Sequence, residues 1–212
     1  MITKINTGEL LLDGRDSGNN WSMNFVIIML TAFICFFFFF AFIPVSGESM
    51  ENTIHDKQYC FIQRKGYSIS RGDIVTINTS NTEKEHTVIK RVIGLGGDRI
   101  LYMASKDGKL VDLYICKAGS KRFVLRNEPY IKEKMKNNLP NIYENTKILP
   151  YRYEFESYEI DDIAEEYEEY IINVPNGYVY FLGDNRNISN DSRHYGAMPM
   201  EKVTSKVLAV VY

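Results

Sequence analysis

The stretch HTVIKRVIG (His86–Gly94), together with the turn GLGGD that ends it, sets the pattern for most of the chain. A short run rich in Val and Ile leads into glycines, as expected for a β-strand that ends in a tight turn. Similar stretches, rich in Val, Ile, Tyr and Phe, are QYCFIQR, DIVTIN, RILYM, VDLYICK, KRFVLR, YVYFLGD and SKVLAVVY. Many short strands separated by Gly-containing turns are typical of antiparallel β architecture. The sequence therefore predicts a mainly β domain.

Length and composition limit the classes of protein that the chain can represent. Its 212 residues suffice for one domain of ordinary size plus an appendage, and 45% hydrophobic with 25% charged residues describe a globular protein. The formal net charge of -2 provides no basic excess to neutralise phosphates, so no nucleic-acid partner is expected. The three cysteines lack metal-ligand spacing. Because Cys35 lies in an apolar run, Cys60 and Cys116 are the only plausible disulfide pair, and a bridge between them is not favoured.

An apolar run, FVIIMLTAFICFFFFFAFI (Phe25–Ile43), contains no charged residue. With Asn24 it makes about 20 residues, or roughly 30 Å of helix, which matches the hydrocarbon core of a bilayer. A secretory signal has a shorter apolar core and a small-residue cleavage site, so we expect an uncleaved anchor. The predicted organisation is a tail at 1–23, a transmembrane anchor at 24–43 and a large domain at 44–212.

Basic residues on either side of the apolar run indicate its orientation. The tail carries Lys4 and Arg15, whereas Lys57 is the only Lys or Arg in the twenty residues after the run. Positive charge favours the cytoplasmic side of a membrane. We therefore expect a single-pass protein of the cell membrane, with its N-terminus cytoplasmic and its 44–212 domain on the extracytoplasmic side.

The region from about 130 to 170 differs from the strands around it. It contains YEFESYEIDDIAEEYEEY, an acidic stretch with interleaved tyrosines and isoleucines. We interpret the region as an insertion that is partly helical around Asp161–Ile171. Its carboxylates show no fixed ligand spacing, so a solvated charged face explains them better than a metal site does, and no metal is expected.

Serine, lysine and histidine supply the candidate chemistry. The glycines of GLGGD lack the full spacing of a phosphate-binding loop and are interpreted as turn residues. His55, His86 and His194 lie among polar residues, where a histidine is usually just exposed. His86 precedes Lys90 by four positions, an even spacing that puts both on one face of a strand. His86 is therefore a candidate base for a serine nucleophile.

The alternative base is Lys90, acting on Ser49. A lysine accepts a proton only when it is neutral, so its pKa of about 10.4 must fall toward roughly 7–8, at a cost of roughly 3–4 kcal/mol. Burial against apolar surface lowers a lysine pKa, and Val88 and Ile89 beside Lys90 favour such a setting. A lysine next to an arginine at a strand end is more often solvated, so spacing alone does not decide between the two bases.

Four segments of the chain resemble the type I signal peptidases, the membrane-anchored serine proteases that remove signal peptides. SMENTI resembles that family's Ser-Met-x-Pro-Thr-Leu box, and RGDIVTI resembles its Arg-Gly-Asp-Ile-Val strand. KRVIGLGGD resembles its lysine box, and GDNRNISNDSRHYG resembles its Gly-Asp-Asn-Arg-x-x-Ser-x-Asp-Ser-Arg box. The four segments follow the family's order and occupy 49–54, 71–77, 90–98 and 183–196, while NEPYI at 127–131 fits the Gram-positive branch.

The resemblance implies a fold, an activity and partners. The implied fold is an antiparallel β-sheet catalytic domain with an inserted small α+β region, preceded by one transmembrane helix. The implied activity is that of a serine endopeptidase of the bacterial type, which removes signal peptides from secreted preproteins after small residues of the Ala-x-Ala kind. No cofactor is implied. The expected partners are preproteins and the lipid bilayer, and the expected form is a monomer.

The family's Ser-Lys dyad implies that Ser49 is the nucleophile and Lys90 the general base. Ser189 matches the serine that orients the lysine, and Asp191 and Arg193 match a salt-bridged pair that shapes the site. Other positions match the family's substrate-binding strand and small-residue pockets, although core packing is an alternative role for the pocket positions. These positions are Val45, Met50, Ile54, Thr87, Val88 and Ile89. Asp184, Asn185 and Arg186 are expected to support their turn.

Three positions mark differences within the family or from it. Gly47 stands where some relatives have a serine that helps the oxyanion hole, so the hole would use backbone N–H groups, including that of Ser49. Asn52 and Gly96 replace family prolines, which is expected to cost loop rigidity worth a few tenths to about 1 kcal/mol.

Two rival functions remain open. One is an accessory factor in pilin or surface-protein assembly that resembles a signal peptidase without its general processing activity. The other is a self-cleaving repressor-type protease, which also uses a serine and a lysine but would need a DNA-binding domain where the apolar run stands.

Overall fold

The described part of the chain forms two compact units. The computed structural model describes residues 21–80, 86–138, 143, 145–152, 159–160 and 165–211, and the units are Met1–Phe37 and Phe38–Tyr212. Most of the expected tail, including Lys4 and Arg15, lies outside the described residues.

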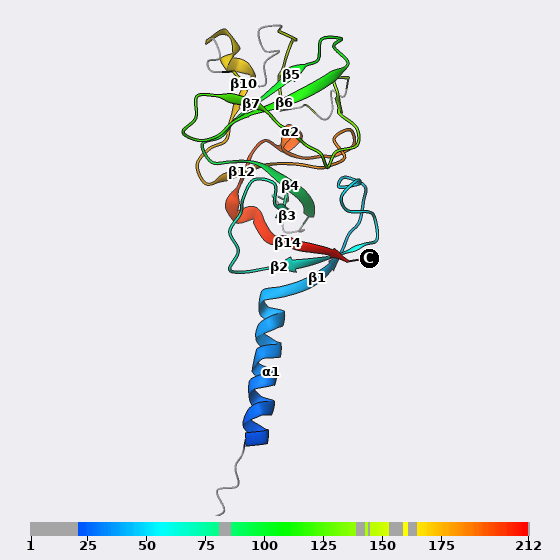
Figure 1. Ribbon diagram of the computed structural model, residues 1–212, viewed down its shortest axis with the longest axis vertical. Coiled ribbons are helices and arrows are strands. Elements are labelled where there is room, and N and C mark those ends of the chain that lie inside the picture. Colours follow the sequence, from blue (N-terminus) through cyan, green and yellow to red (C-terminus); the bar gives the residue numbers. More distant parts are fainter. Residues whose placement is uncertain are drawn as a thin grey trace, which may run out of the picture. The chain divides into compact units, whose positions relative to one another are not determined.

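The apolar run forms one long helix, α1 (Trp21–Phe39), at the blue end of the chain (Figure 1). It begins at Trp21 rather than at Asn24, and none of its residues is buried. Its 19 residues have a length of about 28 Å. Within the described residues α1 is the one helix long and apolar enough to cross a membrane, and it fits a single-pass anchor.

The helix ends at Phe39, whereas the sequence predicts that it continues to Ile43. The following residues form a strand, β1 (Phe40–Pro44), which pairs antiparallel with β2 (Tyr59–Gln63). Two phenylalanine rings of β1 also lie against Phe61, with ring centroids 5.5 and 5.0 Å away. The last residues of the apolar run therefore satisfy their backbone groups in a sheet, a partnership that local composition does not reveal.

One sheet of the Phe38–Tyr212 unit holds seven strands in the order β1-β2-β14-β3-β4-β12-β13. All of its pairings are antiparallel, and Figure 1 shows β1, β2 and β14 next to one another. The strands not yet given are β3 (Ile74–Asn78), β4 (Thr87–Leu95), β12 (Tyr178–Leu182), β13 (Met198–Pro199) and β14 (Val203–Val211).

A second sheet has the order β10-β7-β6-β5-β11, with β8 beside β6 and β9 beside β5. Only the pairing of β5 with β9 is parallel among its described strands. The strands are β5 (Arg99–Ala104), β6 (Leu110–Cys116), β7 (Phe123–Leu125), β8 (Met135–Lys136), β9 (Ile148–Leu149), β10 (Glu159–Ile160) and β11 (Ile171–Asn173). The short helices are η2 (Glu165–Tyr170), α2 (Ser192–Tyr195) and η3 (Met200–Lys202). The protein is mainly β with antiparallel sheets, which confirms the predicted fold class.

The region from 130 to 170 is part of the second sheet. It supplies β8, β9 and β10, and its buried side chains include Met135, Tyr143 and Leu149. The helix expected around Asp161–Ile171 is a 3-10 helix at Glu165–Tyr170, and residues 161–164 lie outside the described residues. The insertion therefore contributes to the core as well as to the surface.

Two smaller expectations concern Gly96 and the cysteines. A Cβ atom at Gly96 would lie 2.9 Å from Asn176 Cα and 3.1 Å from Pro175 O, so this glycine allows two turns to pack closely. Gly96 thus has a packing role that its replacement of a family proline did not indicate. Cys60 and Cys116 are buried free thiols on β2 and β6, which belong to different sheets.

Strand β4 has a free edge that bears on the site. On one side it pairs with β3 from Thr87 to Arg91, and on the other side it pairs with β12 only from Arg91 to Leu95. Thr87–Lys90 therefore have no strand partner on the β12 side among the described residues. An unpaired edge of this kind is a template for an added strand.

Candidate active site

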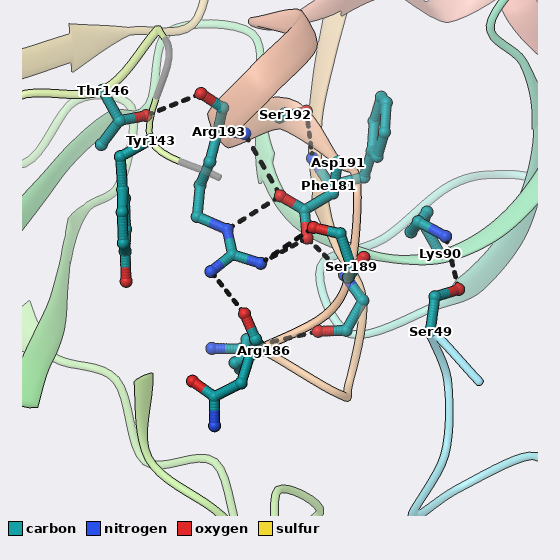
Figure 2. A network of polar contacts seen from close by, with 12 residues as sticks. Ser49, Lys90, Tyr143, Thr146, Phe181, Arg186, Ser189, Asp191, Ser192 and Arg193 are labelled. Carbon is teal, nitrogen blue, oxygen red and sulfur yellow. Dashed lines mark hydrogen bonds and ion pairs between the residues drawn. The ribbon is translucent and has the colours of Figure 1, made fainter. Parts of the chain in front are cut away.

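Ser49 and Lys90, which are far apart in the sequence, are in contact. Lys90 lies on β4 opposite Val75 of β3, and Ser49 lies in a turn after β1. Lys90 Nζ donates a hydrogen bond to Ser49 Oγ at 2.7 Å (Figure 2). It donates another to Ile89 O at 3.0 Å. This separation is within the range expected for a nucleophile and its base.

The surroundings of Lys90 favour its neutral form. The residue is 3% exposed, and no ion pair of the described residues includes it. Burial lowers the pKa of Lys90 to about 8, although the charges of Asp191 and Asp184 oppose this shift. Arg193 adds a smaller lowering contribution. The lysine is therefore poised to exchange a proton near neutral pH.

The Ser49 turn is fixed by backbone hydrogen bonds. Gly47 N donates to Asp56 Oδ1 at 2.9 Å, and the N–H groups of Thr53 and Ile54 donate to the carbonyl oxygen of Met50 at 3.0 and 2.9 Å. Ser49 O accepts from the N–H of the Asn185 loop at 3.1 Å. No hydrogen bond of the described residues uses the Ser49 N–H as donor, so this group is available to an incoming oxygen.

Asp191 and Arg193 form a fully buried, two-pronged ion pair. Arg193 Nε and Nη2 donate to the two carboxylate oxygens of Asp191 at 2.9 and 2.8 Å (Figure 2). Both side chains are 0% exposed. Burial raises the pKa of Asp191, but the charge and hydrogen bonds of Arg193 outweigh burial and hold the pKa below its usual value. Gly183 N also donates to Asp191, at 3.0 Å. The pair thus holds together the loop that supports Ser49.

Ser189 lies beside the Ser49 turn. Its Oγ atom is buried and is not bonded to Lys90; the nearest polar group that it influences is the Asp191 carboxylate, whose pKa it helps to lower. The Cβ position that Gly183 lacks is 2.2 Å from Ser189 Oγ and 2.5 Å from Ser49 O. A side chain at position 183 would clash with both oxygen atoms, so only glycine fits there. The hydroxyl of Ser189 has spare bonding capacity close to the dyad.

Arg91 and Asp184 fix the other end of the Ser49 turn. Arg91 donates to the two carboxylate oxygens of Asp184 at 2.8 and 2.6 Å, and its guanidinium group stacks on the Tyr130 ring at 4.0 Å. Thr53 Oγ1 donates to Asp184 at 2.5 Å. The turn that carries Ser49 is therefore joined to the residue that follows Lys90 in β4. Arg186, from the same loop as Asp184, pairs with the carboxylate of Glu128.

Asn52 has a backbone conformation that proline cannot adopt. Its φ angle is 96°, whereas proline is fixed near -65°. Its side-chain Nδ2 atom lies 3.5 Å from Asp184 O. Asparagine tolerates this left-handed backbone angle, and proline does not. The turn at Asn52 therefore requires a residue other than proline, which is more than the loss of rigidity expected from the sequence.

A cleft of about 860 Å³ runs past the dyad. Among the predicted substrate-binding residues, Val45, Met50, Thr87, Val88 and Ile89 line the cleft. Ile54, the remaining predicted residue, is fully buried in an apolar cluster and does not line the cleft. The free edge of β4 forms one wall, so the cleft can receive an extended peptide.

The histidine alternative is not joined to the serine. His86 is exposed at the cleft, and its Nδ1 atom bonds Thr79 Oγ1 at 3.0 Å. His55 pairs with Glu51 at 2.5 Å. No hydrogen bond of the described residues joins a histidine to Ser49, so Lys90 is the base that the geometry supports.

Sequence reasoning did not single out three features of the site. These are the absent side chain at Gly183, the linkage of Arg91 to Asp184, and the hydroxyl-bearing residues Thr76 and Ser205 in the cleft. Gly183 and Arg91 stand inside the segments that resemble the family boxes, so their position was the available signal. The hydroxyl groups depend on strand register, which the sequence does not display.

Comparisons with known proteins identify the family of the chain. The family model "Signal peptidase, peptidase S26" matches residues 18–212. Signal peptidase I of Streptococcus pneumoniae serotype 4 is 30% identical over 196 residues, which cover 88% of each chain. Signal peptidase IB of Staphylococcus aureus is 26% identical over 192 residues, covering 87% of this chain and 86% of the relative.

Among solved structures, a signal peptidase I from Enterococcus faecalis is similar to 68% of this chain and to 100% of its own, with 24% identity and a TM-score of 0.38. The family match extends over most of the sequence, and it includes the helix, the Ser49 turn, β4 and the loop at 183–193. The chain belongs to the signal peptidase family S26 and is a serine peptidase.

Proposed function

We propose that this chain removes signal peptides from secreted preproteins, with Ser49 as nucleophile and Lys90 as general base. The observation that carries the proposal is the 2.7 Å contact between Lys90 Nζ and Ser49 Oγ, made by a buried lysine whose pKa is lowered to about 8. The signal peptidase relatives support the class of substrate.

The substrate binds as an added strand. The cleavage region of a preprotein extends along the free edge at Thr87–Ile89 and receives backbone hydrogen bonds there. Side chains of an extended strand alternate, so every second side chain faces the cleft. The residue next to the cut bond meets Val45, Met50 and Ile89, which leave room for a small side chain such as Ala.

Proton transfer from Ser49 to Lys90 starts the reaction. Neutral Lys90 accepts the hydroxyl proton while Ser49 Oγ bonds to the carbonyl carbon of the substrate. The carbonyl oxygen becomes negative and accepts from the Ser49 N–H. Protonated Lys90 then gives its proton to the leaving amine as the C–N bond breaks, which leaves an acyl-enzyme. A water molecule, deprotonated by Lys90, attacks the ester. Lys90 returns this proton to Ser49 Oγ as the acyl bond breaks and the signal peptide leaves with a new carboxylate end.

Ser189, Asp191 and Arg193 position these groups. The buried Ser189 hydroxyl lies between the Asp191 loop and the Ser49 turn, and it can bond the lysine once its amine turns during the reaction. The Asp191–Arg193 ion pair fixes the loop whose N–H at Asn185 holds Ser49 O. We assign Ser189 to orienting the lysine and the ion pair to shaping the site.

The anchor keeps the enzyme on the membrane that its substrates cross. α1 crosses the bilayer with the N-terminus cytoplasmic, and the domain lies on the extracytoplasmic side, where a signal peptide's cleavage region emerges. The proposed steps need groups from one chain only, and we propose that the enzyme acts as a monomer.

A precursor cleavage assay tests the proposal. The purified full-length chain in detergent is incubated with a precursor bearing an Ala-x-Ala site, and the product is identified by mass spectrometry. We expect cleavage after the second Ala, and a loss of about 10⁴-fold or more in Ser49→Ala and Lys90→Ala.

His86→Ala is the matched control and should cleave normally, because His86 is not joined to Ser49. A fully active Lys90→Ala variant would contradict the dyad. An unsubstituted chain that cuts no precursor would favour the accessory-factor alternative instead.

A further inference from the structure

The proposed mechanism leaves the segment NEPYI (127–131) without a role. This segment comes shortly after β7 of the second sheet, whereas the loop at 183–193 follows β12 of the first sheet. The two segments meet at Glu128, whose carboxylate oxygens both accept hydrogen bonds from the Arg186 guanidinium group, one of them at 2.5 Å. The Glu128 and Arg186 side chains are 5% and 0% exposed. A buried ion pair therefore joins the second sheet to the loop of the candidate site.

Arg186 is bonded in turn to the backbone that supports Ser49. Its Nε atom donates to Gly183 O at 3.0 Å. Its own carbonyl oxygen accepts from Arg193 Nη1 at 2.7 Å (Figure 2). Between these two contacts lies the N–H of Asn185, which donates to Ser49 O at 3.1 Å. The position of Arg186 therefore determines where this N–H group meets the Ser49 turn.

Tyr130 connects Glu128 to the site by a second route. Its hydroxyl group donates to Glu128 Oε1 at 2.7 Å, and its ring lies 4.0 Å from the Arg91 guanidinium group. Arg91 donates to both carboxylate oxygens of Asp184, and it follows Lys90 directly in β4. Glu128 is therefore linked to the loop that supports the nucleophile and to the residue beside the base.

A carboxylate at position 128 is required by the burial of Arg186. Burial lowers the pKa of Arg186, but the charge and hydrogen bonds of Glu128 outweigh burial and raise it. A carboxylate also accepts from both Nη atoms of a guanidinium group at once, which fixes the orientation of the arginine. Glutamine has only one acceptor atom for the two donors and no charge. The Glu128 carboxylate therefore sets both the charge state and the orientation of Arg186.

We propose that Glu128 is a positioning residue for the dyad. It holds Arg186 and Tyr130 in place. Through them it keeps the Asn185 N–H bonded to Ser49 O, so that the nucleophile stays within reach of its base. This inference rests on the proposed function, because it assumes that the Ser-Lys dyad carries out the reaction. It gives the second sheet a part in catalysis, since a displacement of about 1 Å at reacting groups can cost much of the rate.

Cleavage kinetics of the full-length chain in detergent test this role. Glu128→Gln keeps the size of the side chain, and we expect kcat to fall about tenfold or more while KM stays within about twofold. Tyr130→Phe removes only the hydrogen bond to Glu128 and should lower kcat about two- to fivefold. Glu169→Gln is the matched control. It removes the same charge from an exposed ion pair with Lys147 and should leave kcat unchanged.

A double variant separates positioning from stability. Glu128→Leu/Arg186→Met leaves no unpaired buried charge, so it should unfold at nearly the same denaturant concentration as the unsubstituted chain. Its kcat should nevertheless be about tenfold lower or less than that. Amide hydrogen exchange gives a readout that does not need cleavage. We expect the Asn185 N–H to exchange about tenfold faster in Glu128→Gln and in the double variant.

Three results would overturn the proposal. These are an unaltered kcat in Glu128→Gln, a rise in KM alone, and a fall in kcat that only follows the unfolded fraction. Unaltered exchange of the Asn185 N–H in Glu128→Gln would overturn it as well. Failure of the proposed function is recognised separately, because the unsubstituted chain then cuts no precursor while the exchange measurement still decides whether Glu128 holds the Ser49 turn.

Discussion

Two buried cations stand close to each other in this site, and their opposite behaviour shows how the protein uses burial. Arg193 is 0% exposed and stays charged, because Asp191 satisfies its guanidinium group on two sides. Lys90 is 3% exposed, and its hydrogen bonds within the described part of the chain go to a hydroxyl and a carbonyl oxygen. Burial therefore lowers the pKa of Lys90 to about 8, while the pKa of Arg193 is raised by its partner against the effect of burial. One cation supports the structure, and the other is available for chemistry.

Removing the partner of Arg193 should produce the largest change in stability. Asp191→Ala leaves a guanidinium group buried without its carboxylate, and we expect the free energy of unfolding to fall by about 3–5 kcal/mol. Chemical denaturation of the full-length chain in detergent measures this loss. The double variant Asp191→Leu/Arg193→Met should recover most of it, since no unpaired charge remains. A single variant as stable as the unsubstituted chain would remove the contrast between the two cations.

Replacing Lys90 should act in the opposite direction. A pKa that falls from 10.5 to about 8 on folding means that the protonated lysine destabilises the fold by about 3 kcal/mol below pH 8. Lys90→Met should therefore abolish cleavage and raise the free energy of unfolding by about 1–3 kcal/mol at pH 7.

The pH dependence of this gain provides its control. As the pH rises from about 8 toward 10.5, the unfolded state loses its proton too and the penalty on Lys90 disappears. The stability difference between Lys90→Met and the unsubstituted chain should shrink over that interval. A Met variant that is less stable at pH 7 would show that Lys90 is not strained by burial.

Asn52 offers a smaller test of how firmly the Ser49 turn holds its shape. With φ at 96°, Asn52→Pro cannot keep the turn and should cost about 1–3 kcal/mol together with most of the activity. Asn52→Gly adopts the same backbone angle and should change stability by no more than about 0.5 kcal/mol. Denaturation and precursor cleavage are measured on both variants. A proline variant that is more stable and fully active would support the rigidity interpretation drawn from the sequence.

The sequence predicted the strands well because their apolar runs are short and are separated by glycine turns. It placed the end of the helix at Ile43 because Phe40–Ile43 are as apolar as the residues before them, and only pairing with β2 makes them a strand. Local patterns do not contain such long-range pairings.

The site shows the same division between local and long-range information. Spacing alone did not choose between His86 and Lys90; the family boxes pointed to Lys90, and the contact with Ser49 depends on how β4 meets the turn after β1. The roles of Asn52 and Gly96 also depend on tertiary structure, because a backbone angle and a neighbouring turn determine them. The row of Ile89, Thr76 and Ser205 in the cleft likewise depends on the register of three strands.

The pH profile of kcat/KM for precursor cleavage tests the central claim, that neutral Lys90 activates Ser49, most directly. With a pKa of about 8, roughly a tenth of Lys90 is neutral at pH 7, so kcat/KM should rise about tenfold per pH unit below pH 8 and level off above it. His86→Ala should show the same profile. A profile that is flat between pH 6 and 9, or that loses its rise in His86→Ala, would contradict the account.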